Sequence, residues 1–546
     1  MQPAINVVSL AIFLVLFFLV TVVGFLAARW RRADLNHLNE WGLGGRTFGT
    51  VVTWFLLGGD LYTAYTFVAV PGLVFLQGAP GFFAVPYTII AYPIVFIVFP
   101  RLWAVAKKHG YITSADFVAG RFQSRGLALA VALTGILATM PYIALQLVGI
   151  QVVLTALGLQ GKGVLADLPL IIAFVVLAAY TYTSGLRAPA LIALIKDLLI
   201  YLVVIVIIIA IPLNLGGLDA VFKLAHQHAP KVAMTIGAAG TNQFWTLALG
   251  SALALFLYPH AITGVLSSKD GRVVKRNAAF LTAYSLMLGL LALAGFMGLA
   301  AGITVKPSVA GIAANGSSYA VQSSNYMMPA LILQQFPTWF QGVAFAAIVI
   351  GALVPAAIMS IAAANLFTRN VYTAYFRSNA TPADEARVAR IVSLVVKLGA
   401  LVFIIFIPTA NAINFQLLGG VWILQTLPPV VIGLYTRFLH RWALLVGWAV
   451  GMVAGTWMVI SASSGSKSLI SAFTIRNGDG SPLLLFGKYP ATFYAGLIAV
   501  ILNRGVAVVL SLVLNAVRVP NGRDATASDD YMHDVVSGPE VALTGD

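Results

Sequence analysis

Long apolar segments recur along almost the whole chain, and they constrain its fold more than any other feature. A helix needs about 20 mostly apolar residues to cross a bilayer, and windows of that length recur until about residue 517. We therefore predict an all-α polytopic membrane protein with about thirteen transmembrane helices. The expected spans are 5–28, 48–75, 80–106, 126–157, 168–184, 188–214, 242–266, 278–303, 338–367, 388–409, 414–436, 442–462 and 491–517.

Composition and charge exclude several other classes of protein. Only 9% of the residues are charged and the mean hydropathy is +0.94, whereas a soluble domain carries about 25% charged residues. The chain has no Cys, so it has no thiolate metal site, and no cofactor is expected apart from a coupling ion. The net charge of +15 does not indicate nucleic-acid binding, because the basic residues fall in short loops between apolar spans. The expected surroundings are a lipid bilayer.

The distribution of Lys and Arg predicts the orientation of the chain. Of the 32 basic residues, 22 fall in loops on one side of the expected spans and seven on the other. Basic residues accumulate in cytoplasmic loops, so we expect the N-terminus outside and the C-terminus in the cytoplasm. The polar segment from about residue 520 is expected to be a disordered cytoplasmic tail.

Few ionisable residues lie at membrane depth, and each is a candidate for function. An ionised group in hydrocarbon costs at least about 2.5–3.5 kcal/mol, so such residues line cavities or pair with one another. Lys397 is close enough to the cytoplasmic side to extend its amine there, and the sequence indicates no role for Arg504. The others are Asp60, Lys196, Asp197 and His260.

The second span has a sequence typical of a broken helix. Asp60 lies in LLGGDLYTAYTFVAVPG, where Gly58 and Gly59 permit irregular backbone and Tyr62 and Thr63 supply hydroxyls. Broken helices in secondary transporters expose half-helix N-termini to anions and free carbonyls to cations. The alternative is an ordinary packing helix whose Asp bonds to a neighbour.

The seventh span contains ALFLYPHAITG and is the expected counterpart. Pro259 removes a backbone donor between Tyr258 and His260 and distorts the helix. The two segments begin two groups of five spans, which is the arrangement of an inverted repeat. A proline kink alone is also common in membrane helices.

Lys196 and Asp197 are neighbours near the middle of the sixth span. Adjacent helical residues point about 100° apart, so we expect that they do not simply pair with each other and that at least one faces another partner. A buried lysine gains and loses a proton readily. Lys196, with Asp60 or Asp197, is therefore the candidate ion-coupling group, and a structural ion pair with Asp60 is the alternative.

Four motifs resemble the sodium:solute symporter family: WGLGGRTFG, GGDLYTAYTF, YITSADFVAGRF and MSIAAANLFTRNVY. Together with FLYPHAITGVLSSKDGRVVKRN and APALIALIKD, the second is most similar to the bacterial monocarboxylate permeases of that family. The resemblance extends to about residue 517. It implies a non-enzymatic symporter of the bacterial inner membrane with LeuT-type inverted five-helix repeats, one leading helix and two trailing helices.

This resemblance divides the chain into six parts. They are a leading helix and loop (1–47), the first repeat (48–214), an extracellular loop (215–241), the second repeat (242–436), the trailing helices (437–519) and the tail (520–546).

The resemblance also implies a sodium site, and the chain departs from the family there. Carried over residue by residue, the ligands are the carbonyls of Gly58, Leu61 and Ala357 and the hydroxyl of Ser360. The position of the second hydroxyl holds Ile361, which has no side-chain oxygen, and Lys196-Asp197 stands where the family commonly has Thr-Asp. These two departures favour proton coupling, with the remaining oxygens forming an altered site. Sodium coupling is the alternative.

The implied substrate is a small monocarboxylate such as pyruvate, lactate, acetate or propionate. Such a solute needs one anion-binding locus and a small apolar pocket. The candidate polar groups of that pocket are Tyr62, Thr63, Gln146, Tyr258, His260 and Gln425. Gln146 and Gln425 equally suit hydrogen bonds between helices.

Other functions remain open at this point. One is sodium-coupled symport of an amino acid, a sugar or a nucleobase. An intramembrane enzyme is disfavoured because one lone His within the spans provides no set of nucleophile and base. A channel is disfavoured because broken-helix repeats build an occluded site. The sequence also leaves open a small membrane partner subunit.

Overall fold

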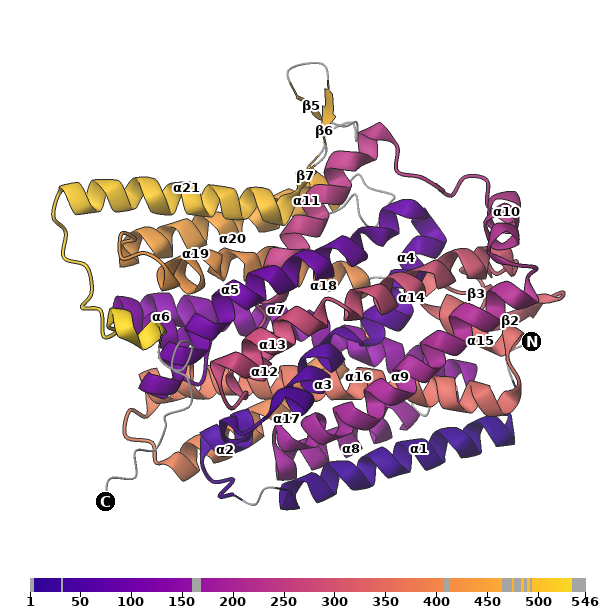
Figure 1. The fold of residues 1–546 in the computed structure, drawn as a ribbon, viewed down its shortest axis with the longest axis horizontal. Coiled ribbons are helices and arrows are strands. Elements are labelled where there is room, and N and C mark those ends of the chain that lie inside the picture. Colours follow the sequence, from indigo (N-terminus) through magenta and orange to yellow (C-terminus); the bar gives the residue numbers. More distant parts are fainter. Residues whose placement is uncertain are drawn as a thin grey trace, which may run out of the picture.

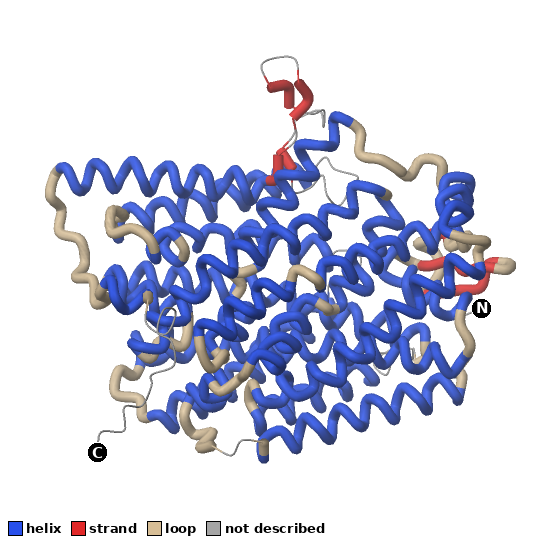
Figure 2. Tube along the Cα trace, in the orientation of Figure 1, coloured by secondary structure: helices blue, strands red, loops and turns tan. Residues whose placement is uncertain are grey.

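The computed structural model describes residues 4–30, 33–159, 168–406, 412–463, 474–475, 483–485, 489–491 and 493–532. Over these ranges the chain is a bundle of long helices that run side by side, as expected for an all-α membrane protein (Figures 1 and 2). The start of α1 lies at the end of the bundle that carries β2 and β3, and α6 lies at the opposite end.

The first group of five spans starts with the expected broken helix. Before it come α1 (Val7–Leu26), η1 (Ala27–Arg29), α2 (Leu38–Leu43) and η2 (Gly44–Arg46). The group itself consists of α3 (Thr50–Leu61) with the π-helix η3 (Tyr65–Ala69) and α4 (Val70–Gln77), then η4 (Ala79–Phe83) with α5 (Ala84–His109), α7 (Arg125–Ala156), α8 (Leu168–Ser184) and α9 (Arg187–Asn214). The short α6 (Ser114–Phe122) joins α5 to α7.

The second group repeats this pattern. It consists of α11 (Ala238–Leu255) with α12 (Pro259–Leu266), α13 (Gly271–Leu281) with α14 (Tyr284–Ala300), α16 (Thr338–Phe367) with η7 (Thr368–Phe376), α17 (Pro382–Phe406), and α18 (Ala412–Ile423) with η9 (Leu424–Thr426), α19 (Leu427–Val430) and η10 (Ile432–Leu434). The trailing helices α20 (Arg441–Ser463) and α21 (Ala495–Ala516) pack on each other.

Both expected breaks are present. The helix axis bends by 44° between α3 and the η3–α4 segment, and by 48° between α11 and α12. The first break falls at Tyr62 and Thr63, just after the two glycines. The second ends at Tyr258, whose extended backbone (φ −58°, ψ 139°) places Pro259 at the first position of α12, where its missing N–H is not needed.

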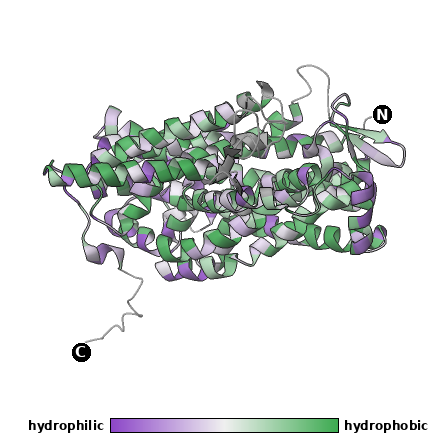
Figure 3. Ribbon diagram, turned by 90° about the horizontal axis from the view of Figure 1, so that it is seen from above, coloured by the Kyte–Doolittle hydropathy of each residue, from purple (hydrophilic) through white to green (hydrophobic). Residues whose placement is uncertain are grey.

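Within the described residues, each of the thirteen expected spans overlaps a helix. Among the described residues, nine helices are long and apolar enough to cross a membrane, and counting each bent pair as one span makes eleven. The two expected spans outside this set are 168–184 and 388–409, at α8 and α17. Large apolar side chains such as Phe18, Leu198 and Trp457 are exposed. Apolar residues make up much of the helices, as the green segments of Figure 3 show. Such a surface suits contact with lipid.

Between the spans the chain forms elements that hydropathy did not predict. The segment 215–241 contains α10 (Leu218–His228). After α14 come β1 (Thr304–Val305), β2 (Ile312–Asn315) and β3 (Ser318–Val321), in the sheet order β1-β3-β2, followed by η6 (Ser324–Tyr326) and α15 (Met327–Gln335). The loop before α21 contains β4 (Thr474–Ile475), β5 (Leu483–Leu485), β6 (Tyr489–Ala491) and β7 (Phe493–Tyr494).

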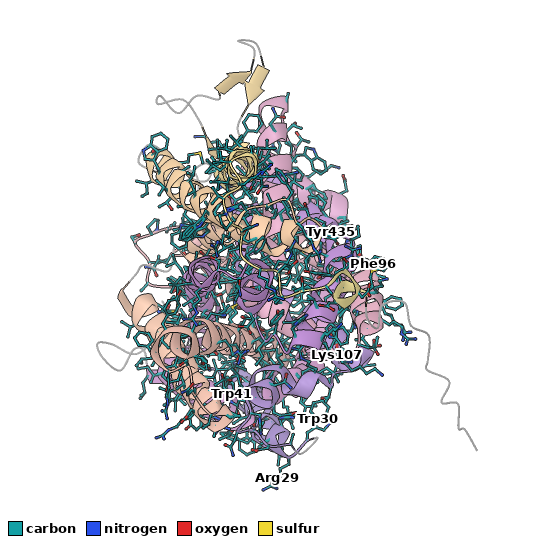
Figure 4. All side chains as sticks on the ribbon, turned by 90° about the vertical axis from the view of Figure 1, so that its left-hand side faces the viewer. Arg29, Trp30, Trp41, Phe96, Lys107 and Tyr435 are labelled. Atoms are coloured by element: carbon teal, nitrogen blue, oxygen red, sulfur yellow. The ribbon has the colours of Figure 1, made fainter. Side chains whose placement is uncertain are left out.

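The expectation of a disordered tail is wrong for residues 520–532. Asp524 accepts a hydrogen bond of 2.8 Å from Arg121 of α6. In η12 (Ser528–Tyr531), Asp530 lies 2.5 Å from the Lys108 amine and 2.7 Å from His109 Nε2 at the end of α5. The acidic composition of this segment predicted disorder. The prediction failed because the basic residues that bind these carboxylates lie in distant segments of the chain. Figure 4 views the bundle from the end that carries α6, and Lys107 and Tyr435 are labelled there. Residues 533–546 lie outside the described range.

Candidate functional site

The ammonium of Lys196 lies against the broken helix at the centre of the bundle. Its Nζ donates hydrogen bonds to the carbonyls of Gly59 and Tyr62, the second at 3.0 Å. Neither Lys196 nor Asp197 has any exposed surface. The carbonyls at the break are therefore met by a cation that belongs to the chain itself.

Lys196 and Asp197 also contact each other, which corrects the expectation that they do not pair. Lys196 Nζ lies 3.1 Å from Asp197 Oδ1. The 100° between their Cβ directions does not prevent this, since the four-carbon stem of a lysine reaches around the helix. Each side chain has a further partner, as expected: the two carbonyls for Lys196, and for Asp197 the hydroxyl of Tyr284, which donates to Oδ2 at 3.1 Å.

The carbonyls that meet the ammonium lie one residue beyond the expected ones. The carbonyl of Gly58 accepts the N–H of Tyr62 at 3.3 Å in the last turn of α3. Leu61 is the last residue of α3, and its side chain lies outside the described set. The break begins at Tyr62, and this sets which oxygens are turned toward α9.

Tyr284, the first residue of α14, belongs to the same cluster, and sequence reasoning missed it. The Tyr62 hydroxyl donates to the Tyr284 carbonyl, and the Tyr284 ring packs over Gly58. A Cβ at Gly58 would lie 2.4 Å from Tyr284 Cζ, and one at Gly59 would lie 2.9 Å from Lys196 Nζ. The two glycines thus allow the Tyr284 ring and the Lys196 amine to approach the backbone of α3. The available signal was a tyrosine hydroxyl inside a largely apolar span.

Asp60 faces the second broken helix rather than Lys196. Its Oδ2 lies 3.4 Å from Nε2 of His260, which is in the first turn of α12. Both residues are buried. The imidazole is surrounded by aromatic rings, with the Tyr142 and Tyr258 centroids 5.4 Å and 5.2 Å away. The structure therefore brings Asp60, Tyr258 and His260 together at the junction of the two breaks.

Thr63 and Gln146 bind the backbone of the unwound segment. The Thr63 hydroxyl accepts the N–H of Tyr65 at 2.9 Å, and Gln146 Oε1 on α7 accepts the N–H of Ala64 at 3.0 Å. The Gln146 amide donates to the Tyr142 carbonyl at 3.3 Å. Both side chains thus replace hydrogen bonds that the broken helix cannot form itself.

Gln425 does not join this cluster. Its side-chain oxygen accepts from the Asn503 amide on α21 at 3.2 Å, and its own amide donates to Val421 at 2.9 Å. Gln425 therefore fixes the trailing helices to η9. Hydropathy could not show which side of the span faces the centre.

The α16 half of the expected sodium site is occupied by internal hydrogen bonds. The Ser360 hydroxyl donates to the Ala357 carbonyl at 2.8 Å and lies 3.2 Å from the Ser393 hydroxyl of α17. Ile361 is fully buried and brings no oxygen. Sodium prefers several oxygen ligands, whereas here Lys196 binds the carbonyls at the break and the α16 oxygens bind each other. The residues as arranged do not fit that ion.

Two further basic residues can now be placed. Lys397 does not extend toward the cytoplasm, contrary to expectation; it is fully buried and its amine donates to Ser393 at 2.7 Å. Its partner is a hydroxyl one turn earlier on the same helix. Arg504 is exposed on α21.

The cavities around the break are too small for an organic solute. One of about 10 Å³ is lined by residues including Tyr62 and Tyr284, and one of about 20 Å³ by residues including Tyr65 and Tyr258. A third, of about 40 Å³, is lined by Asp60 and mostly apolar side chains. A cavity of roughly 10–15 Å³ holds one water molecule. Larger hollows of about 330 Å³ and 710 Å³ lie near the tail and near the β1–β3 sheet. The centre of the bundle is therefore closed in this conformation.

Comparison with known proteins matches this architecture. The profile of the Sodium:solute symporter family matches residues 41–451. A monocarboxylate transport permease protein of Rhizobium johnstonii is 52% identical over 520 residues, which are 94% of this chain and 99% of the relative. An uncharacterized symporter of Bacillus subtilis is 33% identical over 88% of this chain and 97% of its own length. A solved structure of a Na+-coupled sialic acid symporter, in a substrate-bound outward-open state, superimposes with a TM-score of 0.71 at 16% identity, covering 95% of this chain and 99% of that one.

Proposed function

The chain belongs to the sodium:solute symporter family and is a secondary symporter of LeuT-type fold, and we propose that it imports small monocarboxylates by coupling them to protons. The expected solutes are pyruvate, lactate, acetate or propionate. The proposed location is the inner membrane of a bacterium, with the N-terminus outside and the C-terminus in the cytoplasm. The family and its relatives are transporters and not enzymes.

The substrate class is supported by the relative at 52% identity, whose name is that of a monocarboxylate transport permease. The side chains that line the closed centre suit a small solute. Hydroxyls of Tyr62, Thr66 and Tyr284 surround the break, while apolar groups such as Leu288 complete the wall. In this conformation the Tyr62 and Tyr284 hydroxyls donate to the Tyr284 carbonyl and to Asp197. Half-helix N-termini suit one carboxylate, and apolar walls suit a short carbon chain.

The observation that carries proton coupling is the pair of hydrogen bonds from Lys196 to the carbonyls of Gly59 and Tyr62. A protonated lysine supplies a positive charge at the break, and a neutral lysine withdraws it. Binding a proton from outside would hold the break against α9, and releasing it inside would loosen this contact. A ligand shifts a two-state equilibrium only through different affinities for the two states, and this contact provides such a difference.

Sodium coupling of the same or another solute is the second candidate. The family description and the sialic acid symporter both name sodium, and Ala357 and Ser360 still offer oxygens on α16. For sodium to bind, the Lys196 amine would have to leave the carbonyls at the break. The two candidates therefore make opposite predictions for a variant without that amine.

Uptake into proteoliposomes separates the candidates. Labelled pyruvate is presented with an inward proton gradient in sodium-free buffer, and separately with an inward sodium gradient at equal pH. We expect the proton gradient alone to drive accumulation, and Lys196→Met to abolish it. Lys269→Met, at an exposed loop lysine, is the matched control, and protein-free liposomes measure passive entry of the undissociated acid. Accumulation that follows only the sodium gradient would refute proton coupling.

A further inference from the structure

A second lysine is buried in the bundle, and the proposed mechanism does not use it. Lys397 of α17 has no exposed surface, and its one recorded hydrogen bond goes to the Ser393 hydroxyl at 2.7 Å. Other buried cations in the described part of the chain have a carboxylate nearby: Arg187 lies 2.5 Å from Glu40, and Lys196 lies 3.1 Å from Asp197. A buried ammonium without such a partner is costly, so this side chain needs a different explanation.

Among the described residues, the elements packed against α17 bring no carboxylate into contact with this amine. They are α16, α7, α8, α2 and η7. Glu40 of α2 pairs with Arg187, Arg369 of η7 pairs with Glu385, and Arg125 is exposed at the first residue of α7. The charged residues of α17 itself lie about two or more turns earlier. The tyrosines of these elements, none with a recorded contact to the amine, are Tyr142, Tyr180, Tyr182, Tyr372 and Tyr375.

The amine is the first member of a hydrogen-bonded chain that ends on α16. The Lys397 amine contacts the Ser393 hydroxyl, which lies 3.2 Å from the Ser360 hydroxyl, which in turn donates to the Ala357 carbonyl at 2.8 Å. An ammonium has only donors and a hydroxyl has one donor. A charged Lys397 therefore directs the hydrogen of each hydroxyl toward α16.

Each half of the expected cation site is hydrogen-bonded to a lysine, one directly and one through a serine. Lys196 contacts the carbonyls of α3 and the break, and Lys397 is linked to the oxygens of α16 through Ser393. With Lys397 charged, the Ala357 carbonyl accepts from Ser360 and the Ser360 oxygen accepts from Ser393. Neither oxygen is then fully available to a cation.

We propose that Lys397 is a second proton-binding residue of the transport cycle, which acts through Ser393 to engage or release the Ser360 and Ala357 oxygens. A neutral amine has a lone pair, so it accepts the Ser393 hydrogen. The Ser393 oxygen then accepts from Ser360, and the Ala357 carbonyl is released. Loss of one proton from Nζ thus reverses the Lys397–Ser393 and Ser393–Ser360 bonds and breaks the Ser360–Ala357 bond, without moving the helices. Lys397 is a positioning residue in this scheme, and its role in transport rests on the proposed proton coupling.

The test uses the full-length protein and two separate readouts. The first is pyruvate transport in proteoliposomes by wild type, Lys397→Met and Ser393→Ala. We expect Lys397→Met to keep equilibrium exchange of pyruvate while losing accumulation driven by a proton gradient. Ser393→Ala keeps the lysine but cuts the chain, and we expect it to weaken accumulation while also keeping exchange. Exchange and accumulation that fall in proportion in both variants would show a merely structural role and overturn the proposal.

The second readout needs no substrate, so it stands even if the solute or the coupling ion is another one. Thermal stability is measured in sodium and in choline buffers at about pH 6 and about pH 9, in a background that carries Lys196→Met, which frees the carbonyls at the break, and Ile361→Thr, which supplies the missing hydroxyl. We expect sodium to stabilise this variant only at the higher pH. With Lys397→Met added, we expect stabilisation at both pH values, and with Lys397→Arg at neither. A sodium effect that ignores pH while Lys397 is present, or that is absent from the double Met variant, would overturn the proposal.

Discussion

The imidazole of His260 lies against the carboxylate of Asp60, with Nε2 3.4 Å from Oδ2, and this contact joins the two broken helices. Asp60 belongs to the last turn of α3, and His260 to the first turn of α12. In an inverted repeat the two broken helices, α3 with η3–α4 and α11 with α12, are equivalent elements of the two halves. The Asp60–His260 contact therefore couples the conformation of one break to that of the other.

A double-mutant cycle tests this coupling. We expect Asp60→Asn and His260→Gln each to slow pyruvate uptake, and the double variant to be no slower than the worse single one. Both changes act on the same contact, and residues in contact typically show interaction energies of about 0.5–3 kcal/mol. Initial uptake rates in proteoliposomes are the measurement. Fully additive losses would mean that the two side chains act independently.

Gly58 allows the Tyr284 ring to pack against α3, and a methyl group there has no room. The added Cβ would lie 2.4 Å from the ring, so we expect Gly58→Ala to destabilise the protein by about 1–3 kcal/mol. The matched control is Gly126→Ala in the first turn of α7, where an added Cβ meets nothing within 4 Å. Thermal unfolding in detergent compares the two. Equal melting temperatures would show that the ring moves aside without cost.

Gln146 and Gln425 have the same chemistry but lie in different surroundings. Gln146→Leu leaves the Ala64 N–H of the break without its acceptor, so we expect a loss of about 1–3 kcal/mol together with weaker substrate affinity. Gln425→Leu removes a contact to Asn503, so we expect it to lower stability while the KM for pyruvate stays unchanged. A raised KM in Gln425→Leu would place that side chain at the substrate.

The sequence predicted the two breaks because their causes are local. Paired glycines and a proline act on their own backbone, wherever the helix packs. It predicted the burial of Lys196 for a similar reason, since a charge ten residues from a loop has no easy way out of the membrane. The partners of that charge were harder to predict from the sequence. Whether Asp60 faces Lys196 or His260 depends on the rotation of α3 and α12, which hydropathy does not report.

Two of the misjudged residues share one physical feature. Gln425 and the tail residue Asp530 each have a partner whose position depends on the packing of another helix, and no spacing along the chain indicates it. Tyr284 was overlooked because one hydroxyl hardly changes the hydropathy of a span. Lys397 was assigned to the cytoplasmic surface because its stem is long enough, yet Ser393, one turn away, is closer.

Ile361 is the position where one oxygen would restore the implied sodium ligands. We expect Ile361→Thr alone to leave transport independent of sodium, because the Lys196 amine still binds the carbonyls at the break. Ile361→Thr combined with Lys196→Met is expected to make uptake depend on sodium. Uptake at equal pH, with sodium replaced by choline, measures this. Sodium dependence in the Ile361→Thr single variant would show that the amine does not compete with the ion.

The docked tail depends on the carboxylate of Asp530. Burial would raise the pKa of Asp530, but hydrogen bonds from Lys108, the Ala527 N–H and His109 lower it to about 2. Because the pKa in the folded state lies below the ordinary value of about 4, docking is stabilised above about pH 4 and lost as the pH falls toward 2. Asp530→Asn removes this charge at every pH, so we expect trypsin to cleave several-fold faster at Arg523 near neutral pH. Asp529→Asn, at the exposed neighbouring residue, is the control. Equal cleavage of the two variants would mean that other contacts hold the tail, such as the bond from Arg121 to Asp524.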